Sequence, residues 1–248
     1  MKSAMVHIGN FFFRFRNLAF PGIIVVLLLI KAPPSEIFGS HALERLKDII
    51  ALGIVLFGLV FRAVVIGYAY IQRGGLKKRV YAKDLVTEGM FGVCRNPLYV
   101  GNMLIYSGVF LMHGDPLVVF VGIASFAFIY QCIVYAEEAF LEGRFGDGYR
   151  AYCADVPRWL PRIGNFAAAT RGMEFNFKRV IAKDYSTVSA ALIALLLVEI
   201  YKYLAAAEPG QYIVYPSLLV MMMALVGIAT ALVSFLKKRG VFSEGKPA

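Results

Sequence analysis

The residues best suited to chemistry form the segment CRNPLYVGN, residues 94–102, which lies between two apolar stretches. Arg95 supplies a planar, permanently charged group with several N–H donors. Pro97 suits the first turn of a helix, because its missing N–H would have no partner there. A helix that starts here presents free backbone N–H groups and a partial positive charge, which favour an anionic ligand group. Asn96 is either a hydrogen-bonding member of this site or only the cap of the helix.

A second set of polar residues follows the apolar run 116–136 and begins with Glu137 and Glu138. Carboxylates at a membrane boundary are costly unless they are partnered, and Arg95 and Arg144 are the candidate partners. Paired carboxylates there can act as a general base or hold a cationic group, although a solvated helix end is the plainer reading. Two aromatic residues further on are either interfacial anchors or ligand contacts. They are Tyr149 and Tyr152.

The composition is that of a membrane protein. Of the 248 residues, 59% are hydrophobic and only 17% are charged, whereas soluble domains carry about 25% charged residues. The net charge of +10 fits loops that face anionic lipid, which argues against nucleic acid as a partner. The three cysteines are odd in number and lack metal-ligand spacing, so we predict neither a disulfide framework nor a metal site. No small-residue cleavage pattern follows the first apolar run, so we expect a retained span and no removed signal peptide.

Six apolar segments are close to the length that a helix needs to cross a bilayer. They are residues 17–31, 49–72, 98–113, 116–136, 187–206 and 212–236. The third and fourth are separated only by the turn residues 113–116, so they should form an antiparallel helix hairpin. We therefore predict an all-α fold, a polytopic transmembrane bundle of about six spans in a single domain, 1–248. The last two spans, about 187–236, form an additional hairpin.

The distribution of charge predicts the orientation. Residues 73–97 contain six basic and two acidic side chains, and basic residues also precede the first span and follow the last. The loop 31–48 carries no net charge. Because basic loops face the cytoplasm, both termini and the segments 73–97 and 137–186 should be cytoplasmic. The hairpin should then bring Arg95 close to the paired glutamates.

The two polar segments resemble a family of membrane methyltransferases related to isoprenylcysteine carboxyl methyltransferase and phospholipid N-methyltransferase. That family carries a G-x-[YF]-x-x-x-R-H-P-x-Y-x-G stretch, which residues 89–101 match at every position except the histidine. It also has a later acidic pair, then F-G-x-x-Y-x-x-Y and a V-P-x-x-x-P ending, matched here from Glu137 to Pro161. The resemblance covers about residues 80–163.

This resemblance implies S-adenosylmethionine as the methyl donor, bound by a cytoplasmic helical region at the membrane edge, with a lipophilic acceptor entering from the bilayer. The acceptor stays open between a prenylated cysteine, a phospholipid amine and another small lipid, and membrane lipids are the other expected partners. Arg95, Glu137 and Glu138 are the expected catalytic residues. The expected cofactor-binding residues are Gly89, Phe91, Arg95, Asn96, Pro97, Tyr99, Gly101, Glu137, Glu138, Tyr149 and Tyr152. Asn96 replaces the family's histidine and cannot titrate, so it should orient the cofactor and not shuttle protons.

Two charged positions lie inside the predicted spans. Arg62, near the middle of the second span, either faces the bundle interior or snorkels to the membrane surface. If it is functional, it holds an anionic headgroup of the acceptor. Glu199 and Lys202 are three residues apart in the fifth span and should form a structural pair near the outer interface.

Two other classes of function compete with methyl transfer. One is a membrane reductase of the sterol-reductase type, in which the basic cluster 77–79 would meet the 2′-phosphate of NADPH. The other is a non-enzymatic lipid-binding or transport protein, although transport favours polar residues in several spans. Binding of S-adenosylhomocysteine, NADPH or lipid alone would distinguish the three.

Overall fold

The structure, a computed structural model, describes residues 2–68, 82, 84–206 and 214–242. This part of the chain is helical and contains no named strand, as the all-α prediction requires. The six long helices are α1 (Lys2–Leu28), α2 (His41–Gly67), α3 (Pro97–His113), α4 (Pro116–Phe145), α7 (Phe177–Ala206) and α8 (Val214–Lys238). The short elements are η1 (Gly89–Gly92), α5 (Asp147–Asp155), η2 (Ile163–Asn165) and α6 (Phe166–Ala169).

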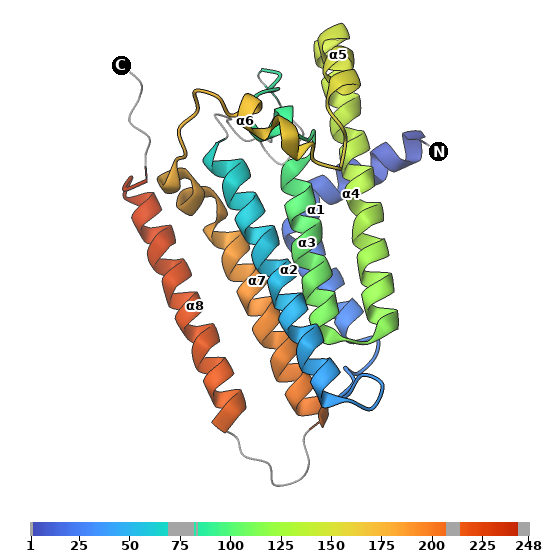
Figure 1. Cartoon of the computed structure of the whole chain (residues 1–248), viewed down its shortest axis with the longest axis vertical. Coiled ribbons are helices and arrows are strands. Elements are labelled where there is room, and N and C mark those ends of the chain that lie inside the picture. The colour runs from blue at the N-terminus through green and yellow to red at the C-terminus, as the bar shows by residue number, and fades with distance from the viewer. Residues whose placement is uncertain (1, 69–81, 83, 207–213, 243–248) are drawn as a thin grey trace.

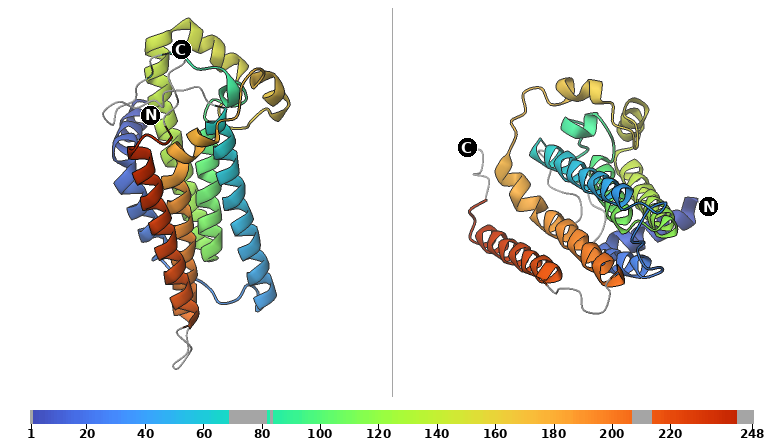
Figure 2. Two further views of the ribbon diagram at one scale, coloured as in Figure 1. Left: turned by 90° about the vertical axis from the view of Figure 1, so that its left-hand side faces the viewer. Right: turned by 60° about the horizontal axis from the view of Figure 1, so that its bottom comes forward.

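The long helices form one bundle, in which α8 packs on α7, α7 on α2 and α3, α3 on α4, and α4 on α1 (Figures 1 and 2). The short helices α5 and α6 lie at one end of the bundle, together with the start of α1 and the end of α8 (Figure 1). The turn between α3 and α4 lies at the opposite end. This arrangement places both ends of the described chain on the same side, as an even number of crossings requires.

Within the described residues, five helices are long and apolar enough to cross a membrane, namely α1, α2, α4, α7 and α8. The sixth, α3, has 17 residues and packs between α2 and α4, so a bundle of about six spans is confirmed. Three starting points were predicted too late. The first span was expected at 17–31, but α1 runs from Lys2 to Leu28. Spans were also expected from 49 and 187, but α2 begins at His41 and α7 at Phe177. No proline precedes Pro21 in α1, and the helix extends through Arg14 and Arg16, which were expected to lie before the span.

Local sequence explains the predicted hairpin. Pro97 occupies the first turn of α3, and Gly114 ends this helix with φ +90°, a conformation that glycine adopts without strain. The Asp115 side chain then accepts hydrogen bonds from the N–H groups of Leu117 and Val118 and so caps α4. The tight turn at 113–116 is confirmed.

Close contact between α2 and α3 depends on glycine. A Cβ at Gly101 would lie 2.5 Å from Cγ of Arg62, and one at Gly58 would lie 2.9 Å from the Gly101 carbonyl oxygen. Small residues let helices approach closely in a membrane. Helix packing therefore accounts for Gly101, which was expected to let the backbone approach a ligand.

Arg62 is buried where α2, α3 and α7 meet. Its guanidinium forms an ion pair with Asp184, with Nε 3.2 Å from Oδ2, and also donates to Asn102. Its remaining N–H groups donate to the Leu98 carbonyl oxygen at 3.4 Å and to Thr187 Oγ1 at 3.3 Å. All five donors are thus used within the protein, which favours the interior reading over snorkelling and a structural role over headgroup binding.

The predicted pair of Glu199 and Lys202 exists and belongs to a larger network at the end of the bundle away from α5. Lys202 Nζ lies 3.9 Å from Glu199 and 2.8 Å from Glu44 of α2. Lys47 Nζ lies 2.7 Å from the same Glu44 and 2.9 Å from the Met112 carbonyl oxygen. These contacts join α2, α3 and α7.

Candidate active site

The predicted meeting of the two polar segments occurs at the α5 end of the bundle. Nη1 of Arg95 lies 3.0 Å from Oε1 of Glu138, and both side chains are largely buried, with exposures of 12% and 14%. A second arginine, Arg158, donates from Nε at 2.8 Å and from Nη2 at 2.9 Å to the two oxygens of Glu138. This hydrogen bonding to Glu138 raises the pKa of Arg158. Glu138 is therefore held between two guanidinium groups.

The segment that carries Arg158 is attached directly to the segment that carries Arg95. The Arg95 N–H donates to the Pro157 carbonyl oxygen at 2.9 Å, and the Arg162 N–H donates to that of Val93 at 3.0 Å. The Asn96 side chain donates to the Arg158 carbonyl oxygen at 3.1 Å and makes no capping bond to α3. Asn96 therefore positions the second polar segment against the first.

The two adjacent glutamates have different environments. Glu137 accepts a 2.7 Å hydrogen bond from the Tyr99 hydroxyl, whereas Glu138 faces the arginines. Consecutive side chains on a helix point about 100° apart, which explains the separation. Arg16 of α1 lies close enough to Tyr99 and Glu137 for its charge to act on both groups.

Sequence reasoning missed two of these residues. Arg16 was taken only as a charge that sets orientation, and nothing in the sequence links α1 to α3. Arg158 occupies a variable position of the V-P-x-x-x-P ending, so the family pattern did not mark it. A basic residue between two prolines, twenty residues after Glu138, was the available signal.

The two tyrosines of α5 are buried and are not interfacial anchors. Tyr152 donates to the Phe91 carbonyl oxygen at 2.8 Å and so connects α5 to η1, while Tyr149 packs beside it. Burial raises the pKa of both hydroxyls, so they are neutral at physiological pH. Gly89 has φ +60°, and a Cβ there would lie 3.0 Å from the Tyr68 carbonyl oxygen. Gly89 and Tyr152 thus support the local backbone, and the expected contacts of Gly89, Tyr149 and Tyr152 with the cofactor stay a prediction.

One donor of the site has no partner. Nε of Arg95 is buried and makes no hydrogen bond within the described part of the chain, although Nη1 also contacts Cys153 Sγ at 2.7 Å. An unpaired buried donor of a cationic group is costly and suits an anionic ligand. Burial raises the pKa of the neighbouring Cys94, so its thiol is protonated and a poor nucleophile. The basic cluster 77–79 lies outside the described residues.

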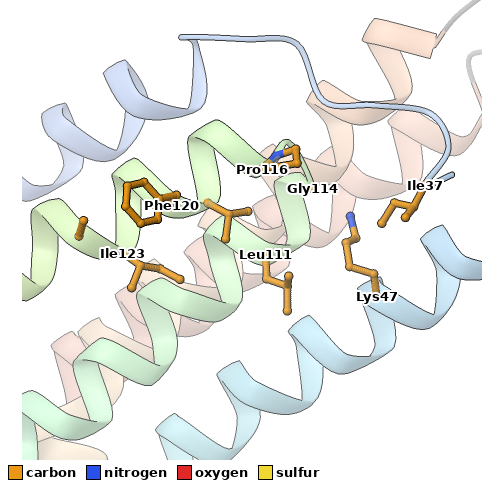
Figure 3. Close-up of a pocket in the computed structure, with 9 residues that line it drawn as sticks. Ile37, Lys47, Leu111, Gly114, Pro116, Phe120 and Ile123 are labelled. Atoms are coloured by element: carbon orange, nitrogen blue, oxygen red, sulfur yellow. The ribbon is translucent and has the colours of Figure 1, made fainter.

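A pocket of about 470 Å³ lies elsewhere, beside the α3–α4 turn (Figure 3). Its lining is apolar except for Lys47, which is already bonded to Glu44 and the Met112 carbonyl oxygen. It contains none of the predicted site residues, and hydrocarbon is the chemistry that fits it. His113, at the end of α3 beside this turn, lies away from the site as predicted; its Nε2 is 3.1 Å from the Leu28 carbonyl oxygen.

Comparison with known proteins supports the predicted resemblance. The family profile described as phospholipid methyltransferase matches residues 48–148, which include most of α2, all of α3 and α4, and the acidic pair. The protein-S-isoprenylcysteine O-methyltransferase of Schizosaccharomyces pombe is 31% identical over 123 residues, which cover 46% of this chain and 49% of that protein. No solved structure matches the chain significantly.

Two bacterial proteins named for metal resistance are also similar. The cobalt-zinc-cadmium resistance protein CzcN of Cupriavidus metallidurans is 34% identical over 79 residues, 32% of this chain and 36% of that protein. The nickel-cobalt-cadmium resistance protein NccN of Alcaligenes xylosoxydans xylosoxydans is 29% identical over 83 residues, 34% of this chain and 38% of that protein. In the described ranges, no group of three or more His, Cys, Asp or Glu side chains could hold a metal ion.

The chain spans about half or less of the length of these curated relatives. The matched segment nevertheless contains the hairpin that brings Arg95 to Glu138. The predicted resemblance is therefore confirmed: residues 48–148 match the phospholipid methyltransferase family, and the chain is similar to a protein-S-isoprenylcysteine O-methyltransferase.

Proposed function

We propose that this protein transfers a methyl group from S-adenosylmethionine to a lipophilic acceptor at the cytoplasmic edge of the membrane. The observation that carries the proposal is the cluster of Arg95, Glu138 and Arg158, with its unpaired Arg95 Nε, at one end of the family-matched hairpin. The basic segments at this end of the bundle support its cytoplasmic placement.

The residues present fit the methyl donor. The free Nε–H of Arg95 would hold its carboxylate, since a guanidinium binds carboxylates through paired N–H donors. The Glu137 carboxylate, which is bonded to Tyr99 and not to an arginine of the second segment, would hold its ammonium group or a ribose hydroxyl. When bound, S-adenosylmethionine supplies an electrophilic methyl group on a sulfonium.

The protein's own contribution is positioning in a water-poor site. Displacement at a methyl group mainly requires that the nucleophile and the methyl carbon be close and aligned. Glu138 and its arginines fix the end of α4 relative to the start of α3, while Tyr99, which donates to Glu137, packs against the aromatic core of α1, α3 and α4. An amine acceptor must lose a proton, for which Glu137 is the better-placed base, whereas a carboxylate acceptor needs no base.

The acceptor class follows from the position of the site at the membrane edge. The Schizosaccharomyces pombe relative is named for methylation of isoprenylcysteine, so a prenylated cysteine carboxylate is the first acceptor to test. The family description makes a phospholipid amine the second.

The proposal is tested with purified protein in detergent and two ligands. S-adenosylhomocysteine at a hundred times its dissociation constant should stabilise the protein by about 2.7 kcal/mol, and NADPH should not. Membranes that contain the protein should then incorporate labelled methyl groups from S-adenosylmethionine into lipid-soluble material. Stabilisation by NADPH alone, with no methyl incorporation, would reject this function in favour of a reductase.

A further inference from the structure

The Gln131 side chain of α4 carries a buried hydrogen-bond donor that has no role in the methyl transfer proposed above. The indole Nε1 of Trp159 donates to Gln131 Oε1 at 2.9 Å. Because an indole N–H can only donate, the amide oxygen must face Trp159 and the NH₂ group must point away from it. This Nε2 is buried and finds no partner among the described residues.

Gln131 lies on the same face of α4 as Glu138. The two are seven residues apart, which is close to two helical turns and about 10 Å along the axis. Between them, the Tyr135 ring lies 5.4 Å from the Arg158 guanidinium carbon. Residues 158 and 159 therefore follow this face of α4, with Arg158 at Glu138 and Trp159 at Gln131, further from the α5 end of the bundle.

The surroundings of Gln131 are apolar. Trp159 packs against the aromatic core cluster that includes Phe126 and Tyr130. Phe128, three residues before Gln131 on α4, and Leu160, which follows Trp159 in the chain, are exposed apolar side chains that suit a lipid environment. An unpaired amide donor in such surroundings costs about 1–3 kcal/mol, and buried polar groups in native proteins are seldom left without a partner. The donor therefore requires an oxygen atom that the described chain does not supply.

We propose that Gln131, oriented by Trp159, binds an oxygen atom in the headgroup of the lipophilic methyl acceptor. This inference rests on the proposed function and extends it to the acceptor. A neutral amide donor recognises a carboxylate, carbonyl or phosphate oxygen and gives nothing to an ammonium group. Such an oxygen is provided by a prenylated cysteine or by a phospholipid. Because Gln131 lies further than Glu138 from the α5 end of the bundle, the acceptor's hydrocarbon tail would remain in the bilayer.

Trp159 makes this site observable, because it is the only tryptophan in the sequence. Protein in nanodiscs with saturating S-adenosylhomocysteine is titrated with N-acetyl-S-farnesylcysteine in one arm. In the other arm, nanodiscs of increasing phosphatidylethanolamine content are compared. One arm should give a saturable change in Trp159 emission, and that arm identifies the source of the oxygen.

The Gln131→Met variant removes the donor with little change in side-chain length. Loss of one hydrogen bond should raise the dissociation constant of the acceptor, measured by Trp159 emission, about tenfold. The KM for the same acceptor should also rise, while the KM for S-adenosylmethionine stays unchanged. Stabilisation by S-adenosylhomocysteine shows that the variant is folded. If Gln131→Met loses this stabilisation, Gln131→Glu takes its place in the comparison, because the glutamate retains an oxygen for the Trp159 N–H.

The inference is overturned if neither probe changes the emission saturably, or if a folded Gln131 variant binds the acceptor as tightly as the wild type. Either result, with S-adenosylhomocysteine still stabilising the wild type, leaves the proposed function intact. Failure of S-adenosylhomocysteine to stabilise the wild type would instead remove the proposed function itself.

Discussion

Glu138→Gln tests whether the carboxylate between two arginines holds the site together. The substitution removes the negative charge that accepts three N–H donors from Arg95 and Arg158. Breaking a buried ion pair costs about 3–5 kcal/mol. The Arg158 side chain is 35% exposed, so solvent screens its part, and we expect a loss of about 2–3 kcal/mol. For a chain of this size this loss lowers the melting temperature by about 4–12 °C.

The matched control is Glu142→Gln, one turn further along α4. Glu142 pairs with Arg150 at 3.1 Å, but the side chains are 44% and 64% exposed, so its loss should cost less than about 1 kcal/mol. Melting is followed in detergent, and methyl incorporation is measured at equal amounts of folded protein. Glu138→Gln should lower methyl incorporation much more than expression. If both variants have the same melting temperature and incorporate methyl groups at the wild-type rate, Glu138 does not hold the site together.

Four further predictions follow. Asp184→Asn leaves the Arg62 charge without its carboxylate and should destabilise the protein by about 3 kcal/mol or more; an unchanged melting temperature would contradict the buried pair. Gly101→Ala should cost about 1–3 kcal/mol because its Cβ would meet Arg62, whereas Gly53→Ala, whose Cβ meets nothing within 4 Å, should be nearly neutral in the same melting assay. Cys94 should react slowly with iodoacetamide at pH 7 and faster only as the pH rises above its raised pKa, as measured by mass spectrometry; rapid alkylation at pH 7 would argue against its burial. A fluorescent protein fused to the C-terminus should fluoresce in cells, since we propose a cytoplasmic C-terminus, and an external C-terminus would leave it dark.

Several features were predictable because they depend on neighbouring residues. Apolar runs of about 20 residues define the long helices, and proline with glycine or aspartate defines the turn at 113–116. Once that turn is predicted, a hairpin must bring the start of α3 to the end of α4. The contact of Arg95 with Glu138 follows from the hairpin and is confirmed by the structure.

Other features could not be predicted because they depend on residues distant in sequence. Arg62 and Asp184 are 122 positions apart, and only the packing of α7 on α2 makes them partners. Gly101 fits a ligand-binding pattern and a helix-packing pattern equally well in sequence. The proximity of Arg16 to Tyr99 requires the position of α1, which begins well before the apolar run.

The binding of labelled S-adenosylmethionine to the Arg95→Lys variant tests the central claim most directly. Lysine keeps a positive charge beside Glu138 but lacks the Nε–H donor that is unpaired in the structure. By equilibrium dialysis, the dissociation constant should rise about tenfold or more, while Arg150→Lys at the exposed pair should bind as the wild type does. Wild-type affinity in a folded Arg95→Lys variant would contradict the assignment of this cluster as the methyl-donor site.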